Sequence, residues 1–159
     1  YKIGEAIEQA IRHHAFNPIT NLSGHGVGHY IIHDKPTIPN YNNHDTNTLR
    51  EGQKIAIEPF ATTGIGSVKE GKPAGIYRLI QKKPVRLPQA RTLINHIETH
   101  YKTLPFTERW LATIPNIRFL LALLERERVI SQYGQLPEQS GGIVSQAEKT
   151  VEIGYGVIT

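Results

Sequence analysis

The sequence predicts an α+β fold. Its 159 residues fit one ordinary domain or two very small ones. Helical and strand-like patterns come in blocks, with a helix first, then strands, a helical block and strands again, which disfavours a doubly wound sheet. Hydrophobic residues make up 38% of the chain, enough for a core. Cysteine is absent, so a disulfide framework, a thiolate nucleophile and a cysteine-based zinc site are excluded.

The first 60 residues predict one helix and two strand regions. Residues 2–14 predict a helix, because Ile3, Ile7 and Ile11 recur every four residues. In the segment NLSGHGVGHYIIH, at 21–33, three glycines disfavour helix and the Tyr-Ile-Ile run favours strand. A loop rich in Pro and Asn is expected from Asp34 to about Thr48. The pattern REGQKIAIEPF then predicts a turn and a strand that ends at Pro59.

Residues 88–130 have apolar residues at helical spacing, unlike the strand-like segments on either side, and predict a helical insert. Helices are expected at 88–101, at 107–114 and at 116–128, with Thr107 and Asn116 as N-caps of the last two. Their core faces are expected to include Leu93, Ile97, Trp110 and Leu121. The tail, with SGGIVSQAEKTVEI and GYGVIT, returns to strand character. The chain therefore divides into residues 1–87, the insert at 88–130 and closing strands at 131–159.

Charge is concentrated in the helical block. The whole chain has a net charge of +4, whereas residues 82–128 alone carry nine basic and four acidic groups. Three basic helices are compatible with a nucleic-acid binder of the winged-helix type. The favoured interpretation is a solvated insert that packs on the sheet, because the apolar positions describe core faces and the charges are scattered. Contact with ribosomal RNA stays open as a weaker form of the first interpretation.

Three histidines and two glutamates are the candidates for chemistry. His25, His29 and His33 share one face of a straight strand, where neighbours four apart lie roughly 13 Å from each other. One of them at most is then a metal ligand, and another could reach a substrate; the alternative is three solvated or hydrogen-bonded histidines. Glu58, in an apolar strand, needs a cation or an ion-pair partner, or it reaches water at the strand end. Nothing near Glu148 favours a ligand over a solvated side chain.

Three separated motifs carry a resemblance to a known family. The segments NLSGHGVGHYIIH, AIEPFATTG and QAEKT resemble those of the methionine aminopeptidases, in the archaeal form of the type 2 branch. The resemblance implies half of the pita-bread fold of creatinases and aminopeptidases, an antiparallel sheet with outer helices, and residues 88–130 match the winged-helix-like insert of type 2 members. It implies a hydrolase that removes the N-terminal methionine of nascent proteins.

The resemblance also assigns roles to four residues. His25, Glu58 and Glu148 fall on metal ligands of the family, and His33 falls on a catalytic histidine that contacts the substrate. His29 receives no role. Such ligands suit Co, Mn, Fe or Zn, with two ions in the complete site. The peptide or nascent protein N-terminus is the implied partner, with possible ribosome contact.

The family pattern is incomplete in this chain. Two further aspartate ligands and another histidine of the family lie upstream of the first helix, and Asp34 and Asp45 do not replace them. We therefore expect at most one metal ion, weak activity alone, and an N-terminal half supplied by another chain or by removed sequence. The absence of Met at position 1 agrees with this expectation.

The surroundings expected for the chain are cytoplasmic. The sequence shows no membrane-spanning run and no secretory signal, and the lack of cysteine fits a reducing compartment. The alternative function is a non-catalytic pita-bread module that binds protein or RNA. Relatives of that kind tend to lose the metal ligands, whereas this chain keeps the three that it could supply.

Overall fold

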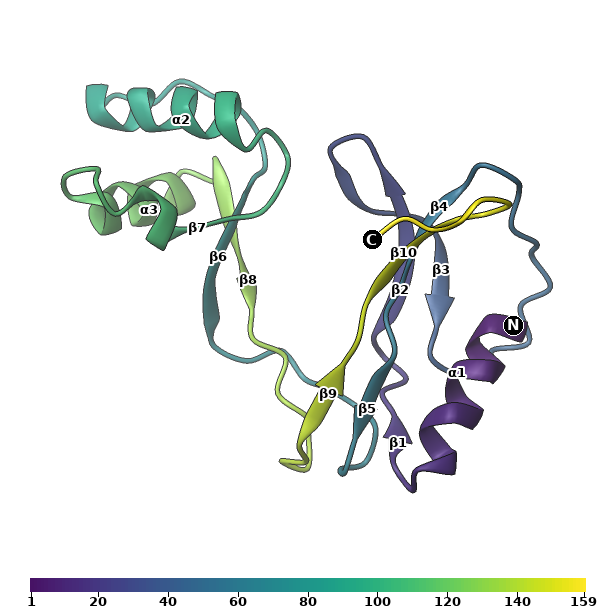
Figure 1. Ribbon diagram of the computed structural model, residues 1–159. Helices are drawn as coiled ribbons and strands as arrows, with labels where there is room; N and C mark the ends of the chain where they lie inside the picture. Colours follow the sequence, from purple (N-terminus) through teal and green to yellow (C-terminus); the bar gives the residue numbers. More distant parts are fainter. The chain divides into compact units, whose positions relative to one another are not determined.

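The computed structural model describes all 159 residues and separates them into two compact units (Figure 1). One unit contains residues 1–70 and 136–159, and the other contains residues 71–135. Antiparallel sheets and helices occur in both, so the predicted α+β class is confirmed. None of the helices has the length and the apolar character that a membrane crossing requires.

The larger unit contains two antiparallel sheets. The first has the strand order β11-β10-β4-β2-β3 and the second has the order β1-β5-β9. The strands of the first sheet are β2 (Ser23–Gly28), β3 (Ile31–Pro39), β4 (Lys54–Ile57), β10 (Lys149–Glu152) and β11 (Gly156–Val157). Those of the second are β1 (Asn17–Pro18), β5 (Phe60–Thr62) and β9 (Val144–Gln146).

A single register links these two sheets. In the first sheet Ile57 of β4 pairs with Lys149 of β10, and in the second Phe60 of β5 pairs with Gln146 of β9. Both pairs belong to the same antiparallel alignment, interrupted only by Glu58–Pro59 on one side and Ala147–Glu148 on the other. The amide of Ala147 donates to the carbonyl of Pro59 across this gap, at 3.2 Å. Glu58 therefore lies opposite Glu148.

The first helix, α1 (Lys2–His13), follows the predicted pattern, with Ile7 and Ile11 buried. The segment after His33 does not follow its prediction. A loop was expected from Asp34, but β3 continues to Pro39 because it pairs with β2 along its length. The polar residue that follows this strand, Asn40, is fully buried, and its side-chain amide donates to the carbonyls of Ile19 and Leu22.

The glycine-rich strand β2 lies between β3 and β4 and needs a residue without a side chain at Gly24. A Cβ added there would lie 2.2 Å from the carbonyl oxygen of Ala56. Glycine permits this close backbone approach. Gly24 therefore allows β2 to pack closely against β4, in addition to disfavouring a helix.

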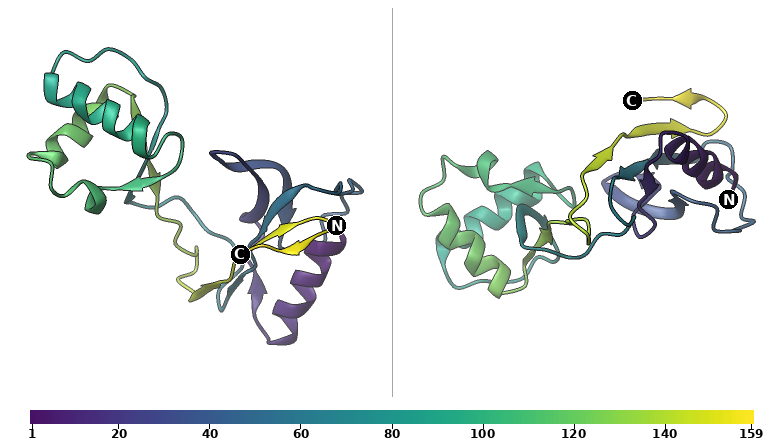
Figure 2. Two further views of the ribbon diagram at one scale, coloured as in Figure 1. Left: turned by 45° about the horizontal axis from the view of Figure 1, so that its top comes forward. Right: turned by 90° about the horizontal axis from the view of Figure 1, so that it is seen from below.

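The smaller unit is built from two helices, a 3₁₀ turn and three short strands. Helices α2 and α3 lie side by side in each view (Figure 2), beside the antiparallel sheet β7-β6-β8. The elements are β6 (Pro73–Leu79), α2 (Pro88–His100), β7 (Phe106–Thr107), η1 (Glu108–Leu111), α3 (Ile117–Arg126) and β8 (Ile130–Gly134). Their shared core contains Leu93, Ile97, Phe106, Leu120, Leu121, Leu124 and Ile130.

Trp110 departs from its predicted place in this core. Its side chain is 58% exposed, whereas Leu111 next to it is buried. The expected helix is a single turn of 3₁₀ helix, which has about three residues per turn instead of 3.6, so a different position faces inward. Thr107 and Asn116 occupy the expected N-cap positions, but neither side chain makes a capping hydrogen bond.

Candidate functional site

His25 and Glu58 form the centre of the candidate site. His25 on β2 has its Nδ1 3.0 Å from the carbonyl oxygen of Gly26, and its Nε2 is 2.8 Å from Oε1 of Glu58. Their side chains are only 14% and 13% exposed. Because a carbonyl can only accept, Nδ1 carries the hydrogen, and a neutral ring then turns its Nε2 lone pair toward the carboxyl group. Either a proton or a cation must therefore lie between Nε2 and Oε1.

A second carboxylate faces this pair across the sheet. Glu148 is exposed, and the register places it opposite Glu58. The side-chain amide of Gln146 donates to both carboxylates, at 3.5 Å to Glu58 and 3.4 Å to Glu148. These two hydrogen bonds are long, so Gln146 offsets little of the like-charge repulsion that opposed carboxylates create. No role was predicted for Gln146 from the sequence, although it belongs to the QAEKT motif.

The environment of Glu58 disfavours its charged form. Burial raises the pKa of Glu58, the negative charge of Glu148 raises it further, and His25 opposes part of this increase. Desolvation and a like charge act together here, as expected for a carboxylate that lacks a sufficient counter-charge. A divalent cation at this place would supply that charge.

His33 reaches the site because its segment folds back on itself. The strand predicted for residues 21–33 is two strands, β2 and β3, joined by a turn at which Tyr30 has a positive φ of 58°. The rings of His25 and His33 consequently have centroids 4.4 Å apart, edge to face, instead of the roughly 26 Å that a straight strand would give eight residues. His29 lies at the turn, against the ring of Tyr30.

A small cavity of about 270 Å³ lies beside the paired side chains. His25, His33 and Glu58 contribute to its wall, and most of the remaining wall is apolar. The apolar lining residues are Leu22, Phe60, Val68, Leu136 and Val144. An uncharged side chain of a peptide would find an apolar surface next to the polar centre.

The predicted metal ligands are only partly assembled. His25 and Glu58 are in contact, Glu148 is connected to Glu58 through Gln146, and no group of three or more His, Asp or Glu residues has metal-binding geometry. Asp34, in β3, and Asp45, in the following loop, both accept from nearby backbone amides, Asp34 from Lys35 and Asp45 from Asn47. The donor chemistry of one imidazole nitrogen and two carboxylates nevertheless fits one ion of the Mn, Fe, Co or Zn type.

Glu138 is a buried carboxylate that sequence reasoning missed. Its side chain is 5% exposed, and one oxygen, Oε2, accepts from the Ser140 amide, the Ser140 hydroxyl and the Gly142 amide at 2.6–3.0 Å. The hydroxyl of Ser140 in turn accepts from the amide of Ile65. The carboxylate fills the space at Gly64, where a Cβ would lie 2.3 Å from Oε2. Glu138 thus connects the loop after β5 with the loop before β9. Glu58 and Glu148 lie at the opposite ends of these two strands.

The sequence is similar to known metallopeptidases. The sequence model of metallopeptidase family M24 matches residues 1–92. The methionine aminopeptidase of Archaeoglobus fulgidus is 48% identical over 160 residues, covering 99% of this chain and 54% of that protein. That of Thermococcus kodakarensis is 48% identical over 153 residues, covering 94% and 52%. The chain therefore spans about half the length of the curated relatives it matches.

Two solved structures show the fold. A thermophilic Arx1 has a TM-score of 0.76 at 19% identity, covering 96% of this chain and 42% of that one. The methionine aminopeptidase from Rickettsia prowazekii has a TM-score of 0.53 at 18% identity, covering 97% and 39%. At these identities the likeness concerns the fold alone, and it confirms the predicted pita-bread architecture.

The environment of Glu138 predicts a loss of stability in acid. The hydroxyl of Ser140, together with the backbone amides, lowers the pKa of Glu138 from 4.5 to about 2. A carboxyl whose pKa is lower in the folded state stabilises the fold above its unfolded pKa, and this contribution disappears as the pH falls from about 4.5 to 2. Glu138→Gln should therefore lower the free energy of unfolding at pH 7. It should also reduce the loss of that free energy between pH 4.5 and 2. Urea denaturation measures both quantities. Glu70→Gln, at an exposed site, is the control, and an unchanged acid slope in Glu138→Gln would contradict the assignment.

The opposed carboxylates predict that Glu148→Gln stabilises the metal-free chain. Like charges opposite each other in a sheet are destabilising, by roughly 0.2–1 kcal/mol, and the substitution removes one of them. Mn²⁺ should then raise the melting temperature of the parent chain more than that of the variant. The matched control is Glu152→Gln on the following strand, β10, because Glu152 pairs with Lys54 at 3.1 Å and its loss should not stabilise. Equal effects of the two substitutions would show that the Glu58–Glu148 repulsion is not significant.

Proposed function

The chain belongs to metallopeptidase family M24, and from this premise we propose that it forms part of a methionine aminopeptidase that removes the N-terminal methionine of nascent proteins. The observation that carries the proposal is the contact of His25 with Glu58, opposite Glu148. Similarity to curated methionine aminopeptidases over 94–99% of the chain supports it. The type 2 assignment, which rests on residues 88–130, and a cytoplasmic location belong to the same proposal.

His25, Glu58 and Glu148 would hold a divalent metal ion. The hydrogen bond from Nδ1 of His25 to the Gly26 carbonyl fixes the tautomer that presents Nε2 as a ligand, an arrangement common around metal-binding histidines. Glu58, held in a poorly solvated position, would bind through the oxygen that now contacts His25. A bound ion of this kind supplies Lewis acidity, which polarises a carbonyl group and makes water acidic near neutral pH.

His33 would act on the substrate. Its ring contacts that of His25 and lines the same small cavity, so a peptide bond placed beside the carboxylates lies within its reach. There it would donate a hydrogen bond to the peptide oxygen on which negative charge develops. Donors aimed at such an oxygen contribute roughly 3–4 kcal/mol to transition-state stabilisation in comparable sites. The apolar wall, which includes Phe60, would accommodate the methionine side chain.

The remaining ligands would come from sequence outside these 159 residues. Three protein ligands can hold one ion with open positions, whereas a two-ion site needs more. Asp34 and Asp45 are exposed and accept from backbone amides next to them in the sequence, which supports leaving them out of the site. We propose that the missing part covers the apolar surface along α1, β4 and β5, where two grooves of about 500 and 560 Å³ are lined by residues such as Ile3, Ile57 and Phe16.

The alternative of a non-catalytic binding module predicts a different site. A module without metal chemistry has no need of a buried carboxylate against an imidazole, because burying such groups is costly unless they are paired or bind a cation. The retention of His25, Glu58 and Glu148 around one point therefore favours the enzyme.

Release of methionine from a Met-Ala-Ser peptide tests the proposed function. The 159-residue chain alone should release little, and a chain extended with the upstream region expected from the resemblance should release methionine efficiently in the presence of Co²⁺ or Mn²⁺. In the extended chain Glu58→Gln should lower kcat/KM by roughly 100-fold or more, because even partners outside the ligand shell change metal-site activity by 10–100-fold. Glu70→Gln should leave the rate unchanged.

Two outcomes would overturn parts of this proposal. Efficient release by the 159-residue chain alone would show that no further ligands are needed. No release by the extended chain, together with no heat of Mn²⁺ or Co²⁺ binding in calorimetry, would favour the non-catalytic module.

A further inference from the structure

Helix α2 carries two histidines that face each other near its C-terminal end. His96 and His100 are four residues apart, so they lie on the same side of the helix, one turn apart. Their rings have centroids 4.1 Å apart and planes that differ by 26°. Both belong to the unit of residues 71–135, whereas His25, Glu58 and Glu148 belong to the other unit. The function proposed above makes no use of them.

A hydrogen bond orients the His100 ring and leaves its Nε2 available as a metal ligand. Its Nδ1 is 2.9 Å from the backbone carbonyl oxygen of His96. Because a carbonyl can only accept, Nδ1 carries the hydrogen, and Nε2 of the neutral ring then has the free lone pair. Metal-binding histidines usually have this arrangement, in which the second ring nitrogen donates to a carbonyl or carboxylate. The hydrogen bond also fixes the ring orientation.

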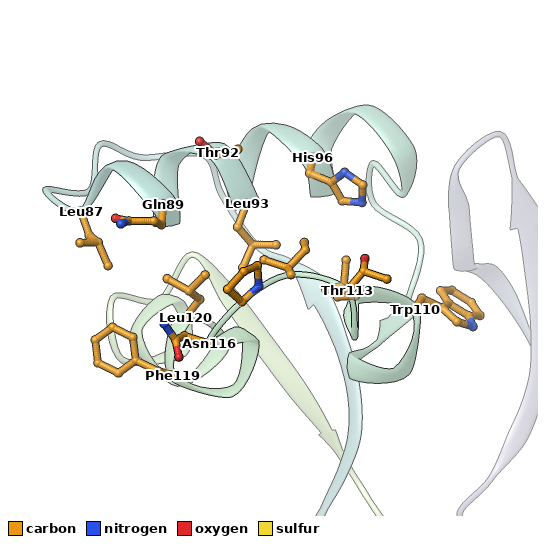
Figure 3. A pocket seen from close by; sticks show the side chains of 13 residues that line it. Leu87, Gln89, Thr92, Leu93, His96, Trp110, Thr113, Asn116, Phe119 and Leu120 are labelled. Atoms are coloured by element: carbon orange, nitrogen blue, oxygen red, sulfur yellow. The ribbon is translucent and has the colours of Figure 1, made fainter.

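His96 is favoured in its neutral form, which is the form that binds metals. Its side chain is half-buried at the edge of a groove of about 720 Å³ between the helices, below α2 in Figure 3. Burial lowers the pKa of His96, and the neighbouring His100 lowers it further. At neutral pH a proton therefore competes less with a metal cation for the ring of His96.

Two histidines at i and i+4 on one face of a helix can bind the same metal ion. Two imidazole nitrogens that bind one ion at about 2.1 Å each are at most about 4.2 Å apart. The stacked rings, with centroids 4.1 Å apart, direct their nitrogen lone pairs along nearly parallel lines, so the side chain of His96 must turn to bring its nitrogen to an ion bound at Nε2 of His100. We propose that His96 and His100 form a second metal site, a two-histidine chelate for Ni²⁺, Cu²⁺ or Zn²⁺ with water in the remaining positions.

The preference of this site should differ from that of the candidate centre. Imidazole nitrogen without carboxylate suits Ni²⁺, Cu²⁺ and Zn²⁺, whereas carboxylate-rich centres also accept Mn²⁺. The acidic residue between the two histidines, Glu98, is already paired with Lys82. Eleven basic and four acidic residues give this unit a net charge of +7, so long-range attraction does not recruit a cation here. Binding should therefore persist at high salt, unlike weak electrostatic binding.

Calorimetric titration of the full 159-residue chain with NiCl₂ in 0.5 M NaCl tests the proposal. The chain and the variants His96→Asn, His100→Asn, His25→Ala and His44→Asn are compared, the last at an exposed loop histidine. A Ni²⁺-binding event should be present in the chain, His25→Ala and His44→Asn, and should weaken by at least about tenfold in His96→Asn and in His100→Asn. Loss of a partner outside the ligand shell alone costs 10–100-fold in metal affinity. Far-UV circular dichroism identifies any variant that has lost helix.

A spectroscopic readout identifies the ligands directly. With one equivalent of Cu²⁺ bound to the His25→Ala chain, electron paramagnetic resonance should show coupling to two imidazole nitrogens, and to fewer after His100→Asn. Titration of the same chain with Mn²⁺ should not reproduce the Ni²⁺ event. The proposal is overturned if His96→Asn and His100→Asn bind Ni²⁺ like the parent chain, or if only one of the two substitutions has an effect.

Discussion

The contact between His25 and Glu58, with Glu148 opposite, is the interaction on which the rest of the candidate site depends. Two carboxylates and an imidazole converge here, with His25 and Glu58 poorly solvated, and their charges do not balance without an added proton or cation. Burial and like charge raise the pKa of Glu58 for this reason. In a protein with marginal stability, such an arrangement is more readily understood as a ligand set than as a structural contact.

The fold supports this contact from two directions. On one side, the close approach of β2 to β4 at Gly24 brings His25 against Glu58. On the other, the buried carboxylate of Glu138 joins the loops next to β5 and β9, and the continuous register of these strands with β4 and β10 sets Glu58 across from Glu148. Contacts between elements far apart in the sequence thus set the distance between the side chains of Glu58 and Glu148.

Local patterns in the sequence were sufficient for the helices α1, α2 and α3 and for Glu58 as an unusual residue, but not for contacts made between strands. The predicted spacing of His25 and His33 was wrong because the two central residues of the hairpin turn, His29 and Tyr30, are neither glycine nor proline. Glu148 lies in a polar segment, so only the family resemblance singled it out. Trp110 was expected in the core because a helical period was assumed where the chain makes a 3₁₀ turn.

Anomalous diffraction from crystals of the chain soaked in millimolar MnCl₂ measures the central claim most directly. The claim predicts one strong anomalous peak about 2 Å from Nε2 of His25 and from a carboxylate oxygen of Glu58, with Glu148 turned toward it. The 2.8 Å contact between His25 and Glu58 would then be replaced by two bonds to the ion. A chain that keeps this contact in the presence of Mn²⁺, with no peak between the two side chains, would contradict the claim.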